Sequence, residues 1–142
     1  MAKNYFVILV QYTNRNQDKS IEIIKEYFKK KNVQFSKFLI LDNAIQENFC
    51  EEVGPGISVV NGDNSSYEFS AWQKGLDLIK TNANDEDIIL IANDTFHQNY
   101  STNFIEDIDI SKVNKLDSNF IYGFSDSYIQ KVRLQNYESD TW

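Results

Sequence analysis

Apolar runs alternate with amphipathic segments along the first two thirds of the chain. The clearest run is residues 88–92, where five apolar residues follow an acidic turn and stop at Asn93. A continuous run of this kind is typical of a central strand that is buried on both faces. Further apolar runs predict strands over residues 5–12, 35–41 and 57–60.

Helices are predicted between these strands. Residues 19–31 and 67–81 place apolar side chains at three- and four-residue spacing, which gives each segment one apolar stripe. We expect another short helix over residues 45–52, ended by the Gly54-Pro55-Gly56 sequence. Strands that alternate with helices favour a parallel sheet, so the sequence predicts a three-layer α/β/α sandwich with a mostly parallel sheet.

The pattern changes after the last of these strands. Residues 97–117 are mostly polar and only weakly amphipathic, and residues 119–124 and 128–134 are predicted to pair as a hairpin. We expect a single domain that consists of an α/β core over residues 1–100 and a helix plus hairpin over residues 101–142. An aromatic residue at position 142, after the polar sequence Glu138-Ser139-Asp140, favours the hypothesis that the natural chain continues.

Composition excludes several classes of protein. The chain has 142 residues, of which 42% are hydrophobic, so it can bury one core. A net charge of −7 disfavours nucleic-acid or anionic-membrane binding. The single cysteine, Cys50, excludes an intrachain disulfide, and the sole histidine, His97, makes a histidine-based triad improbable. Without a membrane-spanning run or a secretory signal, we expect a cytoplasmic protein. We also allow for a homo-oligomer.

Polar clusters follow four of the predicted strands. In a parallel sheet the carboxyl ends of the strands lie along one edge, so these clusters should converge into a polar cleft without a basic character. The clusters are Thr13-Asn14-Arg15, Asp42-Asn43, Gly62-Asp63-Asn64-Ser65 and Asn93-Asp94-Thr95.

Each cluster also has a purely structural interpretation. The residues from Thr13 to Asp18 could cap the following helix, with Asn16 and Asp18 as the capping residues. Asp42-Asn43 and Gly62-Asp63 suit tight turns, and Trp72 has the spacing of a core residue. Arg15 could be a solvated loop charge or a phosphate contact.

The common nucleotide-binding loops are missing from the sequence. No Gly-x-Gly-x-x-Gly motif follows the first predicted strand, and no phosphate-binding loop of the P-loop type is present. A nucleotide would therefore be held by the polar strand ends, with or without a metal ion.

The order of these motifs resembles a known family. Four segments of the chain are similar to the nucleotide-sugar-binding half of a GT-A glycosyltransferase. They are residues 7–14, Leu39 to Asn43, Asn64 followed by Phe69 to Leu76, and Ile89 to Thr95. The nearest likeness is to family-2-like enzymes of bacterial surface-polysaccharide synthesis. The resemblance covers about two thirds of the chain and rests on order and spacing. It implies a fold of the nucleotide-diphospho-sugar transferase type.

The resemblance also implies a function and a set of site residues. A sugar would be transferred from a nucleotide-diphosphate sugar to a saccharide or lipid-linked acceptor, with Mg²⁺ or Mn²⁺ against the donor diphosphate. Nucleotide-binding positions would be Thr13, Asn14, Arg15, Asp42, Asn64, Ser65, Trp72 and Gln73, and metal-binding positions would be Asp94 with Asn93 and Thr95.

The chain departs from the family pattern in three ways. It has one carboxylate, Asp94, where two are usual, and Ala71-Trp72-Gln73 replaces the family's Ala-Arg-Asn and so lacks its cation. It also ends before an acceptor-binding half. Asp126 is the one late acid predicted at a strand end and is the candidate catalytic base, although it also suits a turn.

Two other classes of function remain open. The first is a non-catalytic nucleotide or nucleotide-sugar-binding module, or an assembly subunit. The second is a flavodoxin-like or response-regulator-like domain. This last class is disfavoured because the receiver acids and lysine are not at the expected strand ends, and the first loop lacks the composition of a flavin phosphate loop.

Overall fold

The computed structural model describes residues 3–98, 106, 108–117 and 120–121. The chain divides into two units, Met1–Glu106 and Asp107–Trp142. In the second unit, helix α4 (Ile110–Asn114) is capped by Asp109, whose carboxylate accepts hydrogen bonds from the backbone N–H groups of Ser111 and Lys112. The prediction of a single domain with a core over residues 1–100 stays a prediction.

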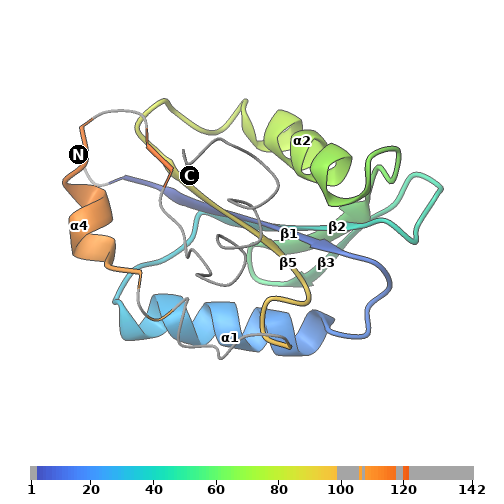
Figure 1. Ribbon diagram of the computed structural model, residues 1–142, viewed down its shortest axis with the longest axis horizontal. Coiled ribbons are helices and arrows are strands. Elements are labelled where there is room, and N and C mark those ends of the chain that lie inside the picture. Colours follow the sequence, from blue (N-terminus) through green and yellow to red (C-terminus); the bar gives the residue numbers. More distant parts are fainter. Residues whose placement is uncertain (1–2, 99–105, 107, 118–119, 122–142) are drawn as a thin grey trace, which may run out of the picture. The chain divides into compact units, whose positions relative to one another are not determined.

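The first unit is built on a mostly parallel five-stranded sheet (Figure 1). Strands β1, β2, β4 and β5 run parallel to their neighbours, and β3 runs antiparallel to β4. The strand order is β3-β4-β2-β1-β5. An α/β fold with a mostly parallel sheet is therefore confirmed. The strands are β1 (Tyr5–Gln11), β2 (Lys37–Asp42), β3 (Cys50–Gly54), β4 (Ile57–Asn61) and β5 (Ile88–Asn93).

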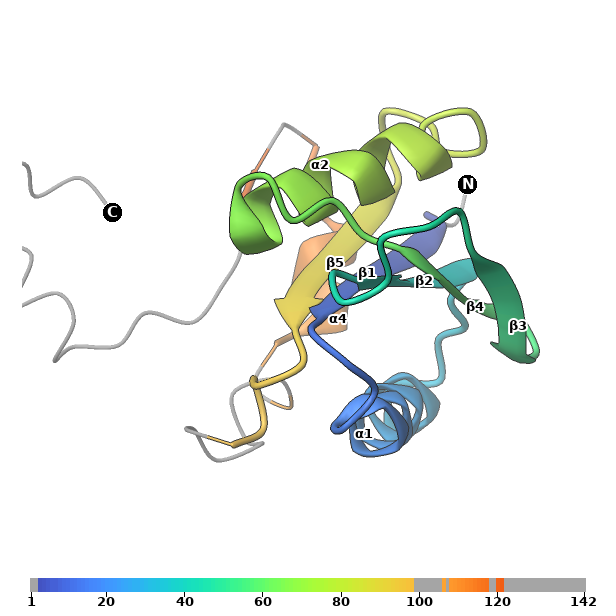
Figure 2. The same cartoon turned by 90° about the vertical axis from the view of Figure 1, so that its right-hand side faces the viewer.

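Two helices of the first unit lie on opposite faces of this sheet (Figures 1 and 2). Helix α1 (Gln17–Lys30) buries Ile24, Tyr27 and Phe28, and helix α2 (Tyr67–Ile79) buries Ala71, Gly75 and Ile79. Alternate residues of β1 and β2 point to opposite faces of the sheet, so each face has its own apolar layer. The layer beneath α2 contains Phe6, Ile8, Val10, Leu39, Leu41 and Val60.

The position predicted for residues 88–92 is wrong. Strand β5 pairs only with β1 in the described part of the chain and so forms an end of the sheet. It is partly exposed along its length, with Ile91 43% exposed, whereas β1 is buried throughout. A run of apolar residues indicates that a strand packs against other apolar side chains. It does not indicate whether the strand has a neighbouring strand on one side or on both. Within the described residues, β4, β2 and β1 each have a neighbouring strand on both sides.

The helix predicted over residues 45–52 is also wrong. No helix forms there, and Cys50–Gly54 is strand β3, the hairpin partner of β4. The turn contains Pro55 and then Gly56, which has a φ of 71°. Proline followed by a glycine with positive φ is the pattern of a tight type II turn, so the sequence predicted to end a helix joins two strands. The exposed side chains of β3 gave no alternating pattern.

The hairpin predicted near the end of the chain lies outside the described residues, apart from Phe120 and Ile121, which have no regular structure. Asp126 lies outside them too. Across the described ranges, no helix combines the length and the apolar character needed to cross a membrane.

Candidate functional site

The carboxyl ends of the four parallel strands lie along one edge of the sheet. Gln11 of β1 is in register with Asp42 of β2, and Asp42 with Asn61 of β4. On the other side of β1, Val10 is in register with Asn93 of β5. The polar clusters of the sequence therefore gather at this edge, which we call the carboxyl edge.

Asp42 connects the ends of β1 and β2. Its side chain is buried, with 4% exposed. Oδ1 accepts hydrogen bonds from the backbone N–H of Thr13 at 3.1 Å and of Ala44 at 2.9 Å, and Oδ2 accepts one from Gln11 Nε2 at 2.9 Å. The carboxylate is thus occupied by protein donors and holds the loop after β1 in place. A ligand hydroxyl would have to share it with them.

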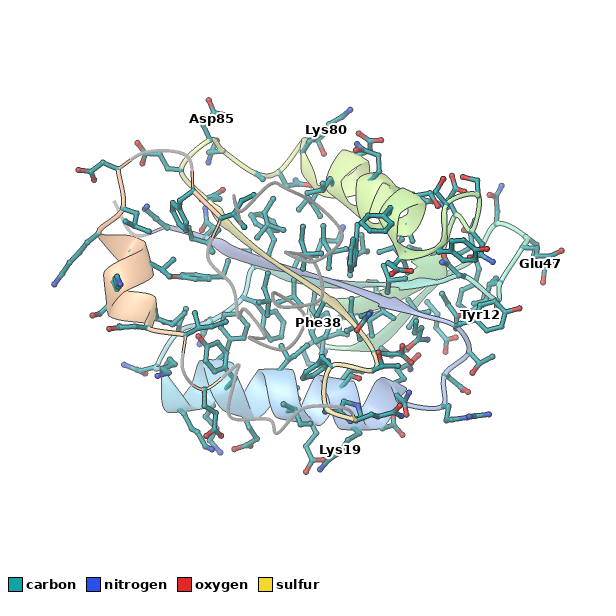
Figure 3. All side chains as sticks on the ribbon, viewed as in Figure 1. Tyr12, Lys19, Phe38, Glu47, Lys80 and Asp85 are labelled. Carbon is teal, nitrogen blue, oxygen red and sulfur yellow. The ribbon has the colours of Figure 1, made fainter. Side chains whose placement is uncertain are left out.

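The loop held by Asp42 has an unusual backbone conformation at Thr13. The φ of Thr13 is 70°, in the left-handed region, where a β-branched residue is a genuine outlier. Such a conformation costs about 1–3 kcal/mol and is concentrated at ligand-binding and catalytic sites. The preceding residue, Tyr12, is 65% exposed and projects at the same end of the molecule as Glu47 (Figure 3). The loop therefore presents an aromatic ring to solvent on a fixed backbone.

Asp94 connects β5 to the start of α1. Its backbone N–H donates to the carbonyl oxygen of Val10 at 2.9 Å, and its Oδ2 accepts from Asn16 Nδ2 at 3.0 Å. Gln98 Nε2 donates to Asn16 Oδ1 at 2.8 Å. Burial raises the pKa of Asp94 above its ordinary value of 3.8, and the hydrogen bond from Asn16 opposes that rise.

The raised pKa of Asp94 predicts a pH-dependent effect of Asp94→Asn. Burial penalises the ionised carboxylate in the folded state, so wild-type stability should fall as pH rises from the ordinary pKa through the higher folded-state value. The amide of the variant does not titrate and can still accept from Asn16. The variant should gain stability relative to wild type as pH rises from about 4 to about 7 in urea unfolding. Asp85→Asn, at an exposed position, is the control and should show no such trend.

A flat difference between wild type and Asp94→Asn across that pH range would contradict the assignment. So would a variant that loses relative stability as pH rises.

The loop between β4 and α2 docks on the end of β2. Asn43 Nδ2 donates to Asn64 Oδ1 at 3.2 Å and to the carbonyl oxygen of Tyr67 at 3.1 Å. Gly62 N–H donates to the carbonyl oxygen of Asp42 at 2.8 Å, and a Cβ at position 62 would lie 3.0 Å from the Cα of Asn43. The absence of a side chain at Gly62 therefore permits this close approach. Ser65 is exposed, and its N–H donates to Asp63 Oδ1 at 2.9 Å.

Aromatic side chains lie at the start of α2. Tyr67 is 73% and Phe69 is 68% exposed. Trp72 is partly buried, its Nε1 donates to the carbonyl oxygen of Ala92 at 3.0 Å, and its ring meets that of Phe69 edge-on at 5.5 Å. This contact fixes Trp72 against β5. Exposed rings such as Tyr12, Tyr67 and Phe69 are able to stack on a nucleobase or on the apolar face of a sugar.

The remaining predicted residues are exposed and are less closely tied to the carboxyl edge. Asn14 and Arg15 are exposed in the loop after β1. Gln73 is exposed, and its Nε2 lies 3.4 Å from Asp77 Oδ1, along α2 and away from its start. Three residues at this edge were not predicted as binding residues: Gln11, Asn16 and Asn43. Gln11 interrupts an otherwise apolar run, which is the signal that could have identified it.

The donor set around Asp94 fits a divalent cation only with help from a ligand. Asp94 supplies one carboxylate, while Asn93 Oδ1 already accepts from Thr95 Oγ1 at 3.1 Å. Within the described residues, no group of three or more His, Cys, Asp or Glu side chains is arranged to hold a metal ion. Mg²⁺ and Mn²⁺ prefer several oxygen ligands, so phosphate oxygens would have to complete the shell. A bound divalent cation stays a prediction.

A cavity of about 460 Å³ lies away from the predicted site residues. It is formed by the second half of α1, the loop that follows it and the β3–β4 turn, and it contains Lys25, Phe28, Lys29 and Phe35. None of the predicted nucleotide- or metal-binding residues contributes to it.

No protein-family model matches this chain, and neither a curated protein nor a solved structure is significantly similar to it.

Proposed function

We propose that this chain binds a nucleotide-diphosphate sugar at the carboxyl edge and is a sugar transferase, or the donor-binding part of one, with a three-layer fold of the nucleotide-diphospho-sugar transferase type. The observation that carries the proposal is the strained Thr13 loop, which the buried carboxylate of Asp42 holds beside the exposed ring of Tyr12. A rigid polar loop with an exposed ring suits the ribose and base of a nucleotide. The docked Asn64 loop on the other side of β2 suits the diphosphate.

The reaction would be a displacement at the anomeric carbon of the donor sugar. An acceptor hydroxyl oxygen forms the new glycosidic bond, the bond from the anomeric carbon to the diphosphate oxygen breaks, and the nucleoside diphosphate leaves with that electron pair. The hydroxyl proton passes to a general base, for which Asp126 is the candidate. Mg²⁺ or Mn²⁺ held by Asp94, Asn93 and Thr95 would supply positive charge near the leaving diphosphate.

A non-catalytic nucleotide- or nucleotide-sugar-binding module is the second candidate function. It is supported by the hydrogen bonds that the two buried carboxylates at the carboxyl edge already accept in the described part of the chain. Asp42 accepts three hydrogen bonds from protein groups and Asp94 accepts one from Asn16. Neither carboxylate is arranged as an open general base. A module that only binds the nucleotide needs no such base, so this arrangement favours binding without catalysis.

A nucleotide panel tests the proposal. UDP, GDP, CDP and dTDP are each added to the full chain in EDTA or in Mn²⁺, and thermal unfolding is followed. One nucleotide should raise the melting temperature, since a ligand at 100 times its Kd stabilises the folded state by about 2.7 kcal/mol. Asp94→Ala should remove the part of the rise that depends on Mn²⁺, whereas the exposed Asp85→Ala should behave as wild type.

The outcomes separate the two candidates. A rise with turnover of the corresponding sugar nucleotide supports the transferase, and a rise without turnover supports the binding module. No rise with any of the four nucleotides contradicts both.

A further inference from the structure

Lys74 is a cation at the carboxyl edge to which neither a family position nor a sequence motif assigns a role. It belongs to α2, and its Nζ donates to the carbonyl oxygen of Asn61, the last residue of β4, at 2.7 Å. Trp72, two residues earlier, donates instead to Ala92 of β5. Two residues are about 200° apart around a helix, so Trp72 and Lys74 reach opposite sides of α2. Lys74 is thereby directed to the β4 side of the edge.

Among the described residues, the ammonium of Lys74 forms no salt bridge. Throughout residues 3–98, salt bridges join Lys19 to Glu22 and Lys80 to Asp77, and Lys30 pairs with Glu106, but no carboxylate lies within 4.0 Å of Lys74 Nζ. Its side chain is half-buried, and it has three N–H donors, of which one is used on Asn61. Partial burial of a cation that has no salt-bridge partner carries a desolvation cost.

The loop that follows β4 begins directly after Asn61, the residue that Lys74 contacts. Hydrogen bonds from Ser65 lower the pKa of Asp63, and the positive charge of Lys74 adds to that effect, so the ammonium acts on this loop electrostatically. Asn64, the next residue, is held in place by Asn43. Lys74 and a fixed polar loop therefore face the same region of the carboxyl edge.

We propose that Lys74 binds the diphosphate of the ligand, with its free N–H donors directed to diphosphate oxygens, and that it makes the site selective for nucleoside diphosphates over nucleosides. The inference rests on the proposed function, in which this loop lies next to the diphosphate. The family's Ala-Arg-Asn sequence contains a cation that Ala71-Trp72-Gln73 lacks. In this inference Lys74, the next residue, supplies that cation. Charge-assisted hydrogen bonds to phosphate oxygens are among the stronger polar contacts in proteins, and lysine supplies them as a point charge.

The test compares three variants of the full chain. Lys74→Met removes the charge and keeps the length, Lys74→Arg keeps the charge, and Lys80→Met is a matched control on an exposed lysine just after the same helix. Calorimetric titrations in EDTA use inorganic pyrophosphate, then UDP, GDP, CDP and dTDP, and then the four corresponding nucleosides, and the nucleotide titrations are repeated in Mn²⁺.

Lys74→Met should bind pyrophosphate and the preferred nucleoside diphosphate at least about tenfold more weakly than wild type, which corresponds to 1.4 kcal/mol. Its affinity for the nucleoside should be unchanged. Lys74→Arg should keep most of the diphosphate affinity, and Lys80→Met should match wild type. Added salt should weaken wild-type binding more than binding by Lys74→Met, because one screened contact has been removed.

Two results would overturn the inference while leaving the proposed function in place. One is unchanged diphosphate affinity in Lys74→Met. The other is an equal loss of nucleoside and diphosphate affinity, which would mean that Lys74 only holds the Asn61 carbonyl. If wild type binds none of the nucleotides in EDTA or in Mn²⁺, the proposed function fails, and this inference fails with it.

Discussion

Asp42→Ala should lower the free energy of unfolding by about 3 kcal/mol, because it leaves three N–H donors without their charged acceptor. Two of these are the backbone groups of Thr13 and Ala44, and the third is the side chain of Gln11, which is 1% exposed. The left-handed Thr13 loses the bond that holds it, so binding of nucleosides should be lost together with stability. Urea unfolding and nucleoside titration measure the two effects.

Asp42→Asn separates the hydrogen bonds from the charge. The amide keeps an oxygen for the two backbone donors and places an NH₂ group against Gln11. Gln11 Oε1 is buried and has no hydrogen-bond partner among the described residues. It can accept from this group if the Gln11 amide flips, which would break the 2.8 Å hydrogen bond from Gln11 Nε2 to Gln17. We expect a loss of about 1 kcal/mol. If Asp42→Ala were no more destabilising than Asp85→Ala, an exposed site shown in Figure 3, the role of Asp42 as an anchor would be wrong.

Gly75→Ala should destabilise the protein by about 1–3 kcal/mol, the range seen when a well-packed core receives an extra group. The same change inside an exposed helix is stabilising by about 1 kcal/mol, so the sign of the effect is the test. A Cβ at position 75 would lie 2.7 Å from Ile8 Cγ2 and 3.1 Å from Leu41 Cδ2. Both side chains are fully buried and have little room to move.

The control for Gly75→Ala is Gln73→Ala, at an exposed position of the same helix, which should leave stability nearly unchanged. In an Ile8→Ala background, the added cost of Gly75→Ala should shrink, because the nearest methyl group is gone. Stabilisation by Gly75→Ala in the wild-type background would show that α2 is not held this close to the sheet.

The sequence predicted most of the first unit because its elements have strong local patterns. The four parallel strands and the two long helices appear close to their predicted positions. The errors concern features that local pattern does not encode. Strand order decides whether β5 has one neighbour or two, and it depends on contacts between distant segments. The exposed strand β3 is stabilised by pairing with β4, and its own side chains carry no periodic signal.

The candidate site was predicted as a set of positions, but the partners of those positions were not. Asn16 illustrates the difference. It occupies the position before α1 that we expected of a capping residue, yet its side chain makes no capping bond and donates to Asp94 instead. Asp42 was expected to face a ligand, but its carboxylate accepts hydrogen bonds from the backbone N–H groups of Thr13 and Ala44. The hydrogen-bond partner of a side chain depends on donors and acceptors from distant segments, which come together only in the folded chain. The sequence alone does not identify that partner.

The place of β5 in the sheet has a consequence for synthesis on the ribosome. Strands β1 to β4 and helix α1 lie within residues 5–61, and these four strands are adjacent in the sheet. A growing chain can therefore pair them before residues 88–93 emerge, as domains generally fold from the N-terminal side during synthesis. Strand β5 then attaches to the free side of β1 as a last step. Until that moment Asp94 cannot reach Asn16, so the carboxyl edge of a nascent chain lacks the hydrogen bond that joins β5 to the start of α1.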